Sequence, residues 1–592
     1  MNVLSRGMVL LCTAALLPPC PPPEEEGQVR YAILVIGDGM QLAHEIAASR
    51  YLHGTDRGLA HHALPVQTLC TTWDVTTYNR YARALGAAPY DPRSFDPRIG
   101  YDPARGGDRT YDGAWTPPSE DYFFTPLLSW EAPKGREGTR KKIPATDSAS
   151  SATALSCGVK TDDGNIAWLP GDPPGGALTT VAERARAQKG AAFGVVTTVP
   201  FSHATPAAFV SHNVDRDNTA AIAAEMIRDV RPDVVIGAGH PATTAPFPWR
   251  KEEEYTLGTF VKSKEGDFYE CTQAGISGKT VPKWDPAPGA ATADGTVLWT
   301  RRPNGMNFTF IGKEDYEGLS AGTRPPYDEY RFVERAPGRD GAKALASAVE
   351  EILSRPGGRR LFGLFGGRRR YMDHPVPVDD PGHPRFLPPP PEDPPLAACA
   401  SAALRVLTHR AGPKGFFLMV EAGDIDWANH QRDYAWMIGA MRQLDETVRT
   451  IIAFVEDPST PLTWENTLLI VTADHANGGL RFAGDRRLGK GALPRQIEAA
   501  APRKTGEEAP PGPAPTAPPP DPDEERRSWT YPGQEIRYGA PGHHTNEPVT
   551  VHARGAGASF LRSYEGRWYP GTRLVDNTHL YEVLRRAMGL AP

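Results

Sequence analysis

Residues 31–38 read YAILVIGD, an apolar run that ends in Gly37 and Asp38. A short run of this kind, rich in β-branched residues, predicts a strand that is buried on both faces of a sheet. Six similar runs follow, at residues 193–199, 233–236, 361–365, 416–420, 468–472 and 549–553. Apolar residues recur every three or four positions in the intervening stretches 178–188, 219–228, 342–354, 397–407 and 434–454. This alternation predicts an α/β fold with a doubly wound, mostly parallel central sheet flanked by helices.

The composition sets limits on the class of protein. The chain has 592 residues, of which 40% are hydrophobic and 23% charged, enough apolar material for a large core. The formal net charge of -6 provides no basic field, so nucleic acid is not expected as a partner. The 60 prolines, about twice the usual share, predict long connections outside the regular elements.

Three stretches interrupt the alternation of strands and helices and are expected to be insertions in a catalytic domain over residues 29–592. Residues 79–142 show little periodicity and are predicted to be an irregular surface insertion. Residues 256–302 carry aromatic residues spaced by Gly and Pro, which predicts a small inserted β module whose aromatics form its own core. Residues 483–540 form a proline-rich insertion.

The N-terminal residues 1–20 are typical of a targeting segment. Arg6 precedes an uncharged run of the length found in a signal peptide, which predicts export to the periplasm or the medium. Cys20 follows this run, as in lipoprotein signals, although the neighbouring proline departs from the usual pattern. Lipidation of Cys20, with membrane anchoring, and plain cleavage nearby are therefore both open alternatives.

Polar residues follow four of the predicted strands at the point where each strand ends. They are Asp38, His203 with Thr205, Glu421, and Asp474 with His475. One such residue is often only a solvated cap, but the carboxyl ends of parallel strands meet at one edge of a sheet. A shared site for polyvalent cations is the simplest explanation of four such ends.

Asp426 and His430 add a local spacing that suits a metal. If a helix starts here, residues four apart lie on one face, one turn from each other. A histidine with a carboxylate suits zinc, whereas Asp38, Glu421 and the Thr205 hydroxyl offer only oxygen and suit magnesium. Taken alone, the pair would more often be an ordinary surface contact.

Ser148 lies in the stretch Thr146–Ala154, which is predicted to be a loop leading into a helix of small residues. A serine at such a position is most often a simple helix cap. The functional alternative is a nucleophile, since a metal would lower the pKa of its hydroxyl and the helix N-terminus would stabilise an arriving anion.

Five motifs in this order together resemble the alkaline phosphatase family. They are Val35–Met40, Thr146–Ala149, Glu421–His430, Thr472–His475 and His544–Glu547. The resemblance runs from about Tyr31 to the C-terminus, apart from the insertions, and implies a phosphatase that hydrolyses phosphate monoesters through a phosphoserine on Ser148.

The resemblance also implies two Zn²⁺ and one Mg²⁺. Asp426, His430 and His544 match the ligands of one zinc, and Asp38, Asp474 and His475 match those of the other. The magnesium ligands are Asp38, Thr205 and Glu421. Arg216 matches the residue that grips phosphate, although its simpler interpretation is a surface arginine in a loop. Because His543 precedes His544, the ligand assignment at this position has a one-residue alternative.

Two positions differ among members of this family, and here they hold His203 and Trp427. This combination resembles a bacterial subgroup, and Trp427 could equally be a packing residue.

A sulfatase would need Pro and Arg after the nucleophile, where Ser150 and Ala152 stand. A phosphodiesterase usually has a Thr nucleophile and no third metal, and a surface-binding protein on a phosphatase scaffold is a further alternative. Formation of a homodimer stays open.

Overall fold

The computed structural model describes residues 29–104, 130–131, 141–142, 145–246, 249–255, 257–302, 305–367, 371–482, 488–498, 529–532, 535–538 and 544–592. The predicted targeting segment with Cys20, residue His543, and most of the 79–142 and 483–540 stretches beyond their edges lie outside these ranges. Within them, no helix has both the length and the apolar character needed to cross a membrane.

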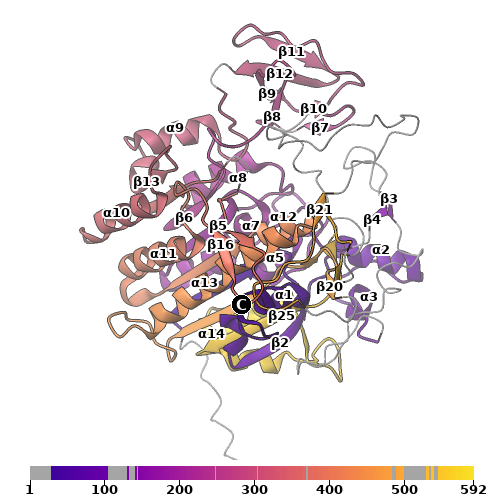
Figure 1. The fold of residues 1–592 in the computed structure, drawn as a ribbon, viewed down its shortest axis with the longest axis vertical. Coiled ribbons are helices and arrows are strands. Elements are labelled where there is room, and N and C mark those ends of the chain that lie inside the picture. Colours follow the sequence, from indigo (N-terminus) through magenta and orange to yellow (C-terminus); the bar gives the residue numbers. More distant parts are fainter. Residues whose placement is uncertain are drawn as a thin grey trace, which may run out of the picture.

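A 10-stranded sheet forms the centre of the molecule (Figure 1). Its strand order is β13-β14-β6-β5-β17-β1-β18-β25-β2-β26. Its strands are β1 (Tyr31–Gly37), β2 (Val66–Thr71), β5 (Ala192–Pro200), β6 (Val234–Ala238), β13 (Tyr330–Glu334), β14 (Arg360–Leu364), β17 (Phe416–Ala422), β18 (Thr467–Thr472), β25 (Val549–Gly555) and β26 (Leu574–Asp576). All neighbours pair in parallel except β25, which is antiparallel to both β18 and β2. The expected mostly parallel sheet is therefore confirmed.

Two layers of helices cover the sheet. One layer contains α1 (Leu42–His53), α10 (Gly341–Leu353), α11 (Leu396–Ala411) and α13 (Tyr434–Glu456), and the other contains α5 (Ser148–Cys157), α6 (Val181–Lys189), α7 (Ala204–Val210) and α14 (Asn577–Ala587). Both α11 and α7 pack against β5 and β17, which places these two helices on opposite faces of the same strands. The sheet is thus buried on both sides, as its continuous apolar runs require.

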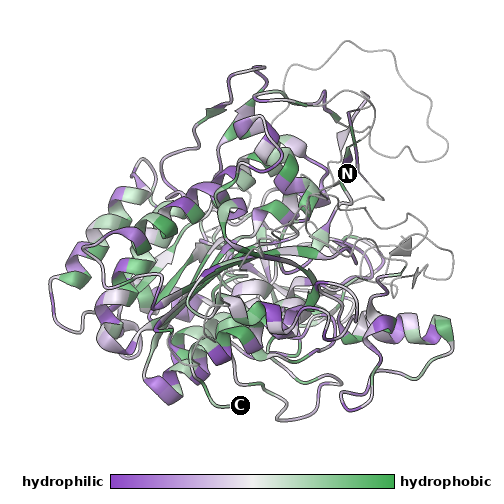
Figure 2. Cartoon of the chain, turned by 90° about the horizontal axis from the view of Figure 1, so that it is seen from below, coloured by the Kyte–Doolittle hydropathy of each residue, from purple (hydrophilic) through white to green (hydrophobic). Residues whose placement is uncertain are grey.

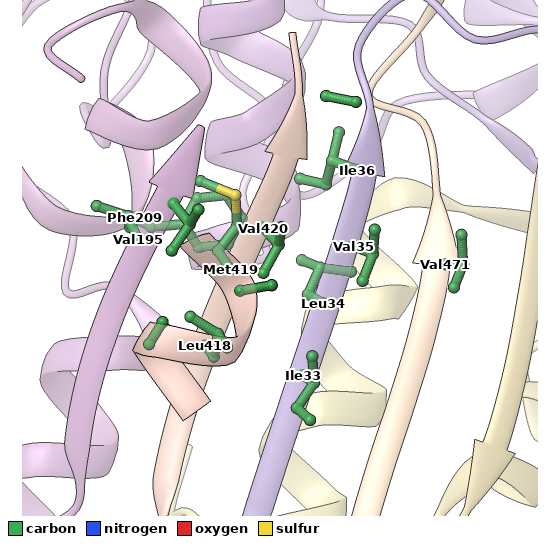
Figure 3. Close-up of a cluster of buried hydrophobic side chains, with 14 of the residues drawn as sticks. Ile33, Leu34, Val35, Ile36, Val195, Phe209, Leu418, Met419, Val420 and Val471 are labelled. Carbon is green, nitrogen blue, oxygen red and sulfur yellow. The ribbon is translucent and has the colours of Figure 1, made fainter. Parts of the chain in front are cut away.

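The core lies on the central strands. Figure 3 shows Leu34 and Val35 of β1 beside Val420 of β17 and Val471 of β18, and these side chains are fully buried. Figure 2 shows the same arrangement as apolar colours gathered on the strands and on the inward sides of the helices. A fully buried β1–β17–β18 unit fixes the backbone from which the polar residues at the strand ends project.

The predicted strands and helices agree with the structure in most places, and the differences have physical causes. Strands β2, β13 and β26 were not predicted, since polar residues interrupt their apolar character. Helix α2 (Val75–Leu85), capped by the Asp74 side chain, extends into the stretch expected to be irregular, and the short helix α3 (Pro97–Gly100) also lies in it. The Tyr and Arg residues of α2 mask the apolar periodicity of this helix in the sequence.

The stretch predicted to be a β module contains a separate sheet, labelled above the main body in Figure 1. Its strands β8 (Phe260–Lys262), β9 (Phe268–Gln273), β11 (Ala291–Asp294) and β12 (Val297–Arg302) form a four-stranded antiparallel sheet. Tyr269 and Trp299 are fully buried in a hydrophobic cluster distinct from the main core, with Trp284 packed against it. The aromatic residues of this stretch therefore serve its own packing.

Candidate active site

The predicted site residues come together at the carboxyl ends of four adjacent strands, β5, β17, β1 and β18. Asp38 follows β1 directly, Glu421 is the last residue but one of β17, and Asp474 follows β18 by one residue. Thr205 lies in α7, which begins just after β5. The sheet order therefore converts distant sequence positions into neighbours, as parallel topology predicts.

Ser148 is the first residue of α5, and Asp147 is the N-cap whose side chain accepts a hydrogen bond from the Ser150 backbone N–H. The cap is thus Asp147, which leaves the Ser148 hydroxyl free of that role. The Ser148 Oγ lies 3.1 Å from Nε2 of His475 and 3.4 Å from Oδ2 of Asp38. A hydroxyl at a helix N-terminus, beside a carboxylate and a histidine, is placed to act as a nucleophile toward an anionic substrate.

Asp38, Asp474 and His475 form one buried cluster around this hydroxyl. Nε2 of His475 lies 3.4 Å from Oδ1 of Asp38 and 3.4 Å from Oδ2 of Asp474. The backbone N–H of Gly39 donates to Oδ1 of Asp474 over 3.1 Å, which fixes that carboxylate. Gly39 has φ of +68°, and a Cβ here would lie 2.7 Å from Oδ1 of Asp426, so only glycine fits.

Asp426, His430 and His544 form the second cluster. The helix expected at Asp426 and His430 is present as α12 (Asp424–His430), and Nε2 of His430 lies 3.1 Å from Oδ2 of Asp426. Nε2 of His544 lies 3.2 Å from Nε2 of His430 and 3.5 Å from Oδ1 of Asp426. The His544 Nδ1 also lies 2.7 Å from the Thr146 carbonyl, two residues before Ser148, which orients the ring.

Thr205 and Glu421 lie on the other side of Asp38. The Thr205 hydroxyl donates to Oδ2 of Asp38 over 3.5 Å, and Thr197 donates to Oε2 of Glu421. Burial, together with the charge of Asp474, raises the pKa of Glu421 to about 8. The set offers only oxygen donors, which is the chemistry that magnesium prefers.

The buried polar atoms of these clusters fit a set of cations. Asp38 Oδ1, Glu421 Oε1 and Asp474 Oδ2 are buried and have no hydrogen-bond partner among the described residues. Burial and then the nearby Asp474, Asp426 and Glu421 carboxylates raise the pKa of Asp38 well above its usual range. Four buried carboxylates in one place are unfavourable without positive charge, so the residues present suit the two zinc ions and the magnesium ion implied by the sequence.

Arg216 lies beside the N-terminus of α5. Its Nη1 donates to Oδ2 of Asp147 over 2.8 Å, and its Nη2 lies 3.5 Å from Nε2 of His203. Burial opposes charge on both partners, but the Coulombic attraction between them holds the pKa of Asp147 below its ordinary value and raises that of Arg216. A charged guanidinium is therefore fixed next to the residue that precedes Ser148.

Trp427 contacts the edge of the His203 ring, with 5.6 Å between the ring centroids, and also packs against Tyr371. It therefore joins the wall of the site to the core. Two supporting residues were not predicted: Asn477, whose amide donates to Asp426 Oδ1 over 2.6 Å, and Thr197. Thr197 lies inside the apolar run of β5, where nothing in the sequence separates it from a packing residue.

Comparisons with known proteins identify relatives of the chain. A family model described as alkaline phosphatase matches residues 134–243 and 379–504, which contain Ser148, Thr205, Arg216 and the stretch from Glu421 to His475. Alkaline phosphatase 3 of Bacillus subtilis is 25% identical over 345 residues, 57% of this chain and 51% of that protein. Alkaline phosphatase of Escherichia coli K12 is 28% identical over 364 residues, 59% of this chain and 62% of its own.

One further relative and one solved structure align with a larger share of this chain. Streptomycin-6-phosphate phosphatase of Streptomyces griseus is 26% identical over 481 residues, 76% of this chain and 80% of that protein. The alkaline phosphatase structure from Thermus thermophilus aligns over 98% of this chain and 96% of its own with 19% identity and a TM-score of 0.49. The chain spans about half the length of the Bacillus relatives.

Proposed function

We propose that the chain, which matches the alkaline phosphatase family model and its curated members, is a metal-dependent phosphatase that hydrolyses phosphate monoesters through a phosphoserine on Ser148. The observation that carries the proposal is the convergence of the Ser148 hydroxyl with two carboxylate–histidine clusters at the N-terminus of α5. A hydroxyl in this setting faces an electron-poor phosphorus with anion-stabilising groups around it.

We assign the metal ligands as follows. Asp426, His430 and His544 hold one zinc, Asp38, Asp474 and His475 hold the other, and Asp38, Thr205 and Glu421 hold magnesium. When bound, these ions lower the pKa of the Ser148 hydroxyl and offset the charge of the phosphoryl oxygens. The protein fixes their places through Gly39, which orients Asp474, and Asn477, which orients Asp426.

Ser148 and Arg216 have different roles in the proposed reaction. The Ser148 oxygen gives up its proton and bonds to phosphorus in line with the leaving oxygen, while the ester P–O bond breaks and the departing alkoxide takes up a proton to leave as the alcohol. Water then cleaves the Oγ–P bond, which releases phosphate and restores the serine hydroxyl. Arg216, held by Asp147, presents its fork to two non-bridging oxygens of the substrate. The N-terminus of α5 adds positive potential at the same place.

Replacement of Ser148 by Ala tests the proposal. Turnover of an aryl phosphate should fall by at least ~1000-fold, on the scale of losing a covalent nucleophile, while the metal content is unchanged because Ser148 is not in the ligand set. The matched control is Ser156→Ala in the same helix, whose hydroxyl contacts Thr153 and Cys157 among the described residues and should leave the rate intact. A Ser148→Ala enzyme with near-normal turnover would contradict the assignment.

A further inference from the structure

A cluster of histidines lies outside the proposed active site. The Glu45 cluster consists of Glu45 in α1, His61 and His62 in a short 3-10 helix (Ala60–Ala63), and His552 in β25. The exposed fractions of the four side chains are 0%, 1%, 3% and 0%. None of these residues belongs to the Ser148 site, and nothing in the proposed reaction uses them.

The donor atoms of the Glu45 cluster converge on one point. The Nε2 atoms of His62, His61 and His552 lie 2.9, 3.1 and 3.4 Å from Oε2 of Glu45. One ligand atom of each of the four residues lies within 4.8 Å of the others. Ligands around a tetrahedral zinc ion, at ~2.0–2.1 Å from the metal, are separated by about 3.3 Å. The same spacing, 3.1–3.5 Å, occurs among Asp426, His430 and His544.

Hydrogen bonding alone does not account for this arrangement. A carboxylate oxygen has about two lone-pair sites, whereas three imidazole nitrogens face Oε2 of Glu45. The other oxygen, Oε1, already accepts from the Thr550 hydroxyl. In addition, Nδ1 of His61 is buried and has no hydrogen-bond partner among the described residues. The cluster therefore has more nitrogen atoms than its single carboxylate can satisfy.

The charge of the cluster also favours a cation. Within the described parts of the chain, all ion pairs of Glu45 are with histidines, and no Lys or Arg forms an ion pair with its buried carboxylate. Burial is the largest cause that lowers the pKa of His61, His62 and His552, which keeps these rings neutral and able to donate a lone pair. A buried anion without a charged partner is costly, and a bound divalent ion removes this cost.

We propose that Glu45, His61, His62 and His552 bind one divalent metal ion, with zinc the ion that best suits three imidazoles and a carboxylate. Four protein ligands complete a tetrahedral shell, which is typical of a structural site. The Leu59 N–H donates to Nδ1 of His62 over 3.3 Å. Metal binding through Nε2 of His62 therefore requires this long hydrogen bond to break and the ring proton to move to Nδ1.

The position of the site indicates what the ion does. His552 lies opposite Val471 of β18 and Gln67 of β2 in the sheet register, on the strand that runs antiparallel to both. Glu45 lies on the helix that directly follows the Asp38 loop. The ion thus ties α1 and the residues before β2 to β25, and it holds the antiparallel strand in the sheet next to the loop that carries Asp474 and His475.

Two measurements on the full chain loaded with zinc chloride and dialysed test the proposal. Anomalous diffraction at the zinc edge should show a peak between the four donor atoms, separate from those near Ser148. Metal analysis should show that Glu45→Gln and His552→Gln each lose one zinc per chain. The matched control, His53→Gln, replaces the last residue of α1, whose side chain is 35% exposed and outside the cluster, and should lose none.

A second pair of variants separates this site from the proposed active site. Asp426→Asn should lose a zinc ion near Ser148 and keep the anomalous peak at Glu45. If Glu45→Gln fails to fold, the diffraction peak of the unaltered protein still decides the question. The absence of that peak in zinc-loaded crystals, or an unchanged zinc content in a folded Glu45→Gln protein, would overturn the proposal.

Discussion

Arg216 shows how a single side chain is prepared for an anion. Its Nη1 binds Asp147 at 2.8 Å, and its side chain is 20% exposed, so the rest of the fork can face the solvent side of the site. Asp147 also caps α5. The same carboxylate thus orders both the helix that begins with Ser148 and the guanidinium beside it, which reduces the entropy lost when a substrate binds.

Replacement of Arg216 by Ala should lower kcat/KM for an aryl phosphate monoester by ~10 to 1000-fold, about 1.4 to 4 kcal/mol of transition-state stabilisation. The loss on an aryl phosphate diester should be smaller, because a diester has only two non-bridging oxygens and less charge. Arg216→Lys keeps the charge but not the fork and should fall between Ala and the unaltered enzyme. Steady-state kinetics on the paired substrates measure this, and equal losses on both would favour a diesterase instead.

His544 gives the corresponding test of a metal ligand. Its Nε2 lies 3.2 Å from Nε2 of His430, whereas its neighbour His543 lies outside the described residues. His544→Ala should remove one zinc per chain and reduce turnover at least ~10-fold, because it removes one of the three protein ligands of that ion. His543→Ala should do neither. Metal analysis of the two proteins decides between them, and the reverse pattern would move the ligand by one residue.

At the scale of helices and strands, the ends of the elements carry the chemistry. β1, β17 and β18 were predictable because each is a continuous apolar run, and the polar residues at their ends could be expected to meet once the strands were parallel. His544 lies instead in β24 (His544–Thr545), a two-residue strand that pairs with β19 (Ala476–Asn477). So short an element has no periodicity, and only the family resemblance pointed to it.

The small β sheet of residues 257–302 offers a test at the same scale. Its core of Tyr269, Trp299 and their neighbours is separate from the main core, and none of the proposed ligands lies in it. Replacement of residues 256–302 by a short Gly/Ser linker should leave kcat on a small aryl phosphate within about threefold of the unaltered enzyme. If the rate or the zinc content collapsed, the sheet would have to be regarded as part of the active domain.

At the scale of the whole molecule, the fold class and the ligand types were predictable, and the Glu45 cluster was not. Ser148, Asp38 and His475 stand in ordered motifs that are specific as a set. Glu45 and His61 are close in the sequence, but His552 follows them by hundreds of residues. Each one alone is an ordinary buried polar residue. Only the placement of β25 between β18 and β2 brings His552 to α1, and a sequence pattern does not encode that sheet order.

The central claim is that Ser148 accepts the phosphoryl group, and trapping the intermediate tests it most directly. The zinc- and magnesium-loaded enzyme is mixed with an aryl phosphate, quenched in acid within one turnover, digested, and analysed by tandem mass spectrometry. The account predicts one phosphoryl group on Ser148, absent when the substrate is omitted. Phosphate on Ser150 or Ser151, or a fully active enzyme from which no phosphoserine can be trapped, would contradict it.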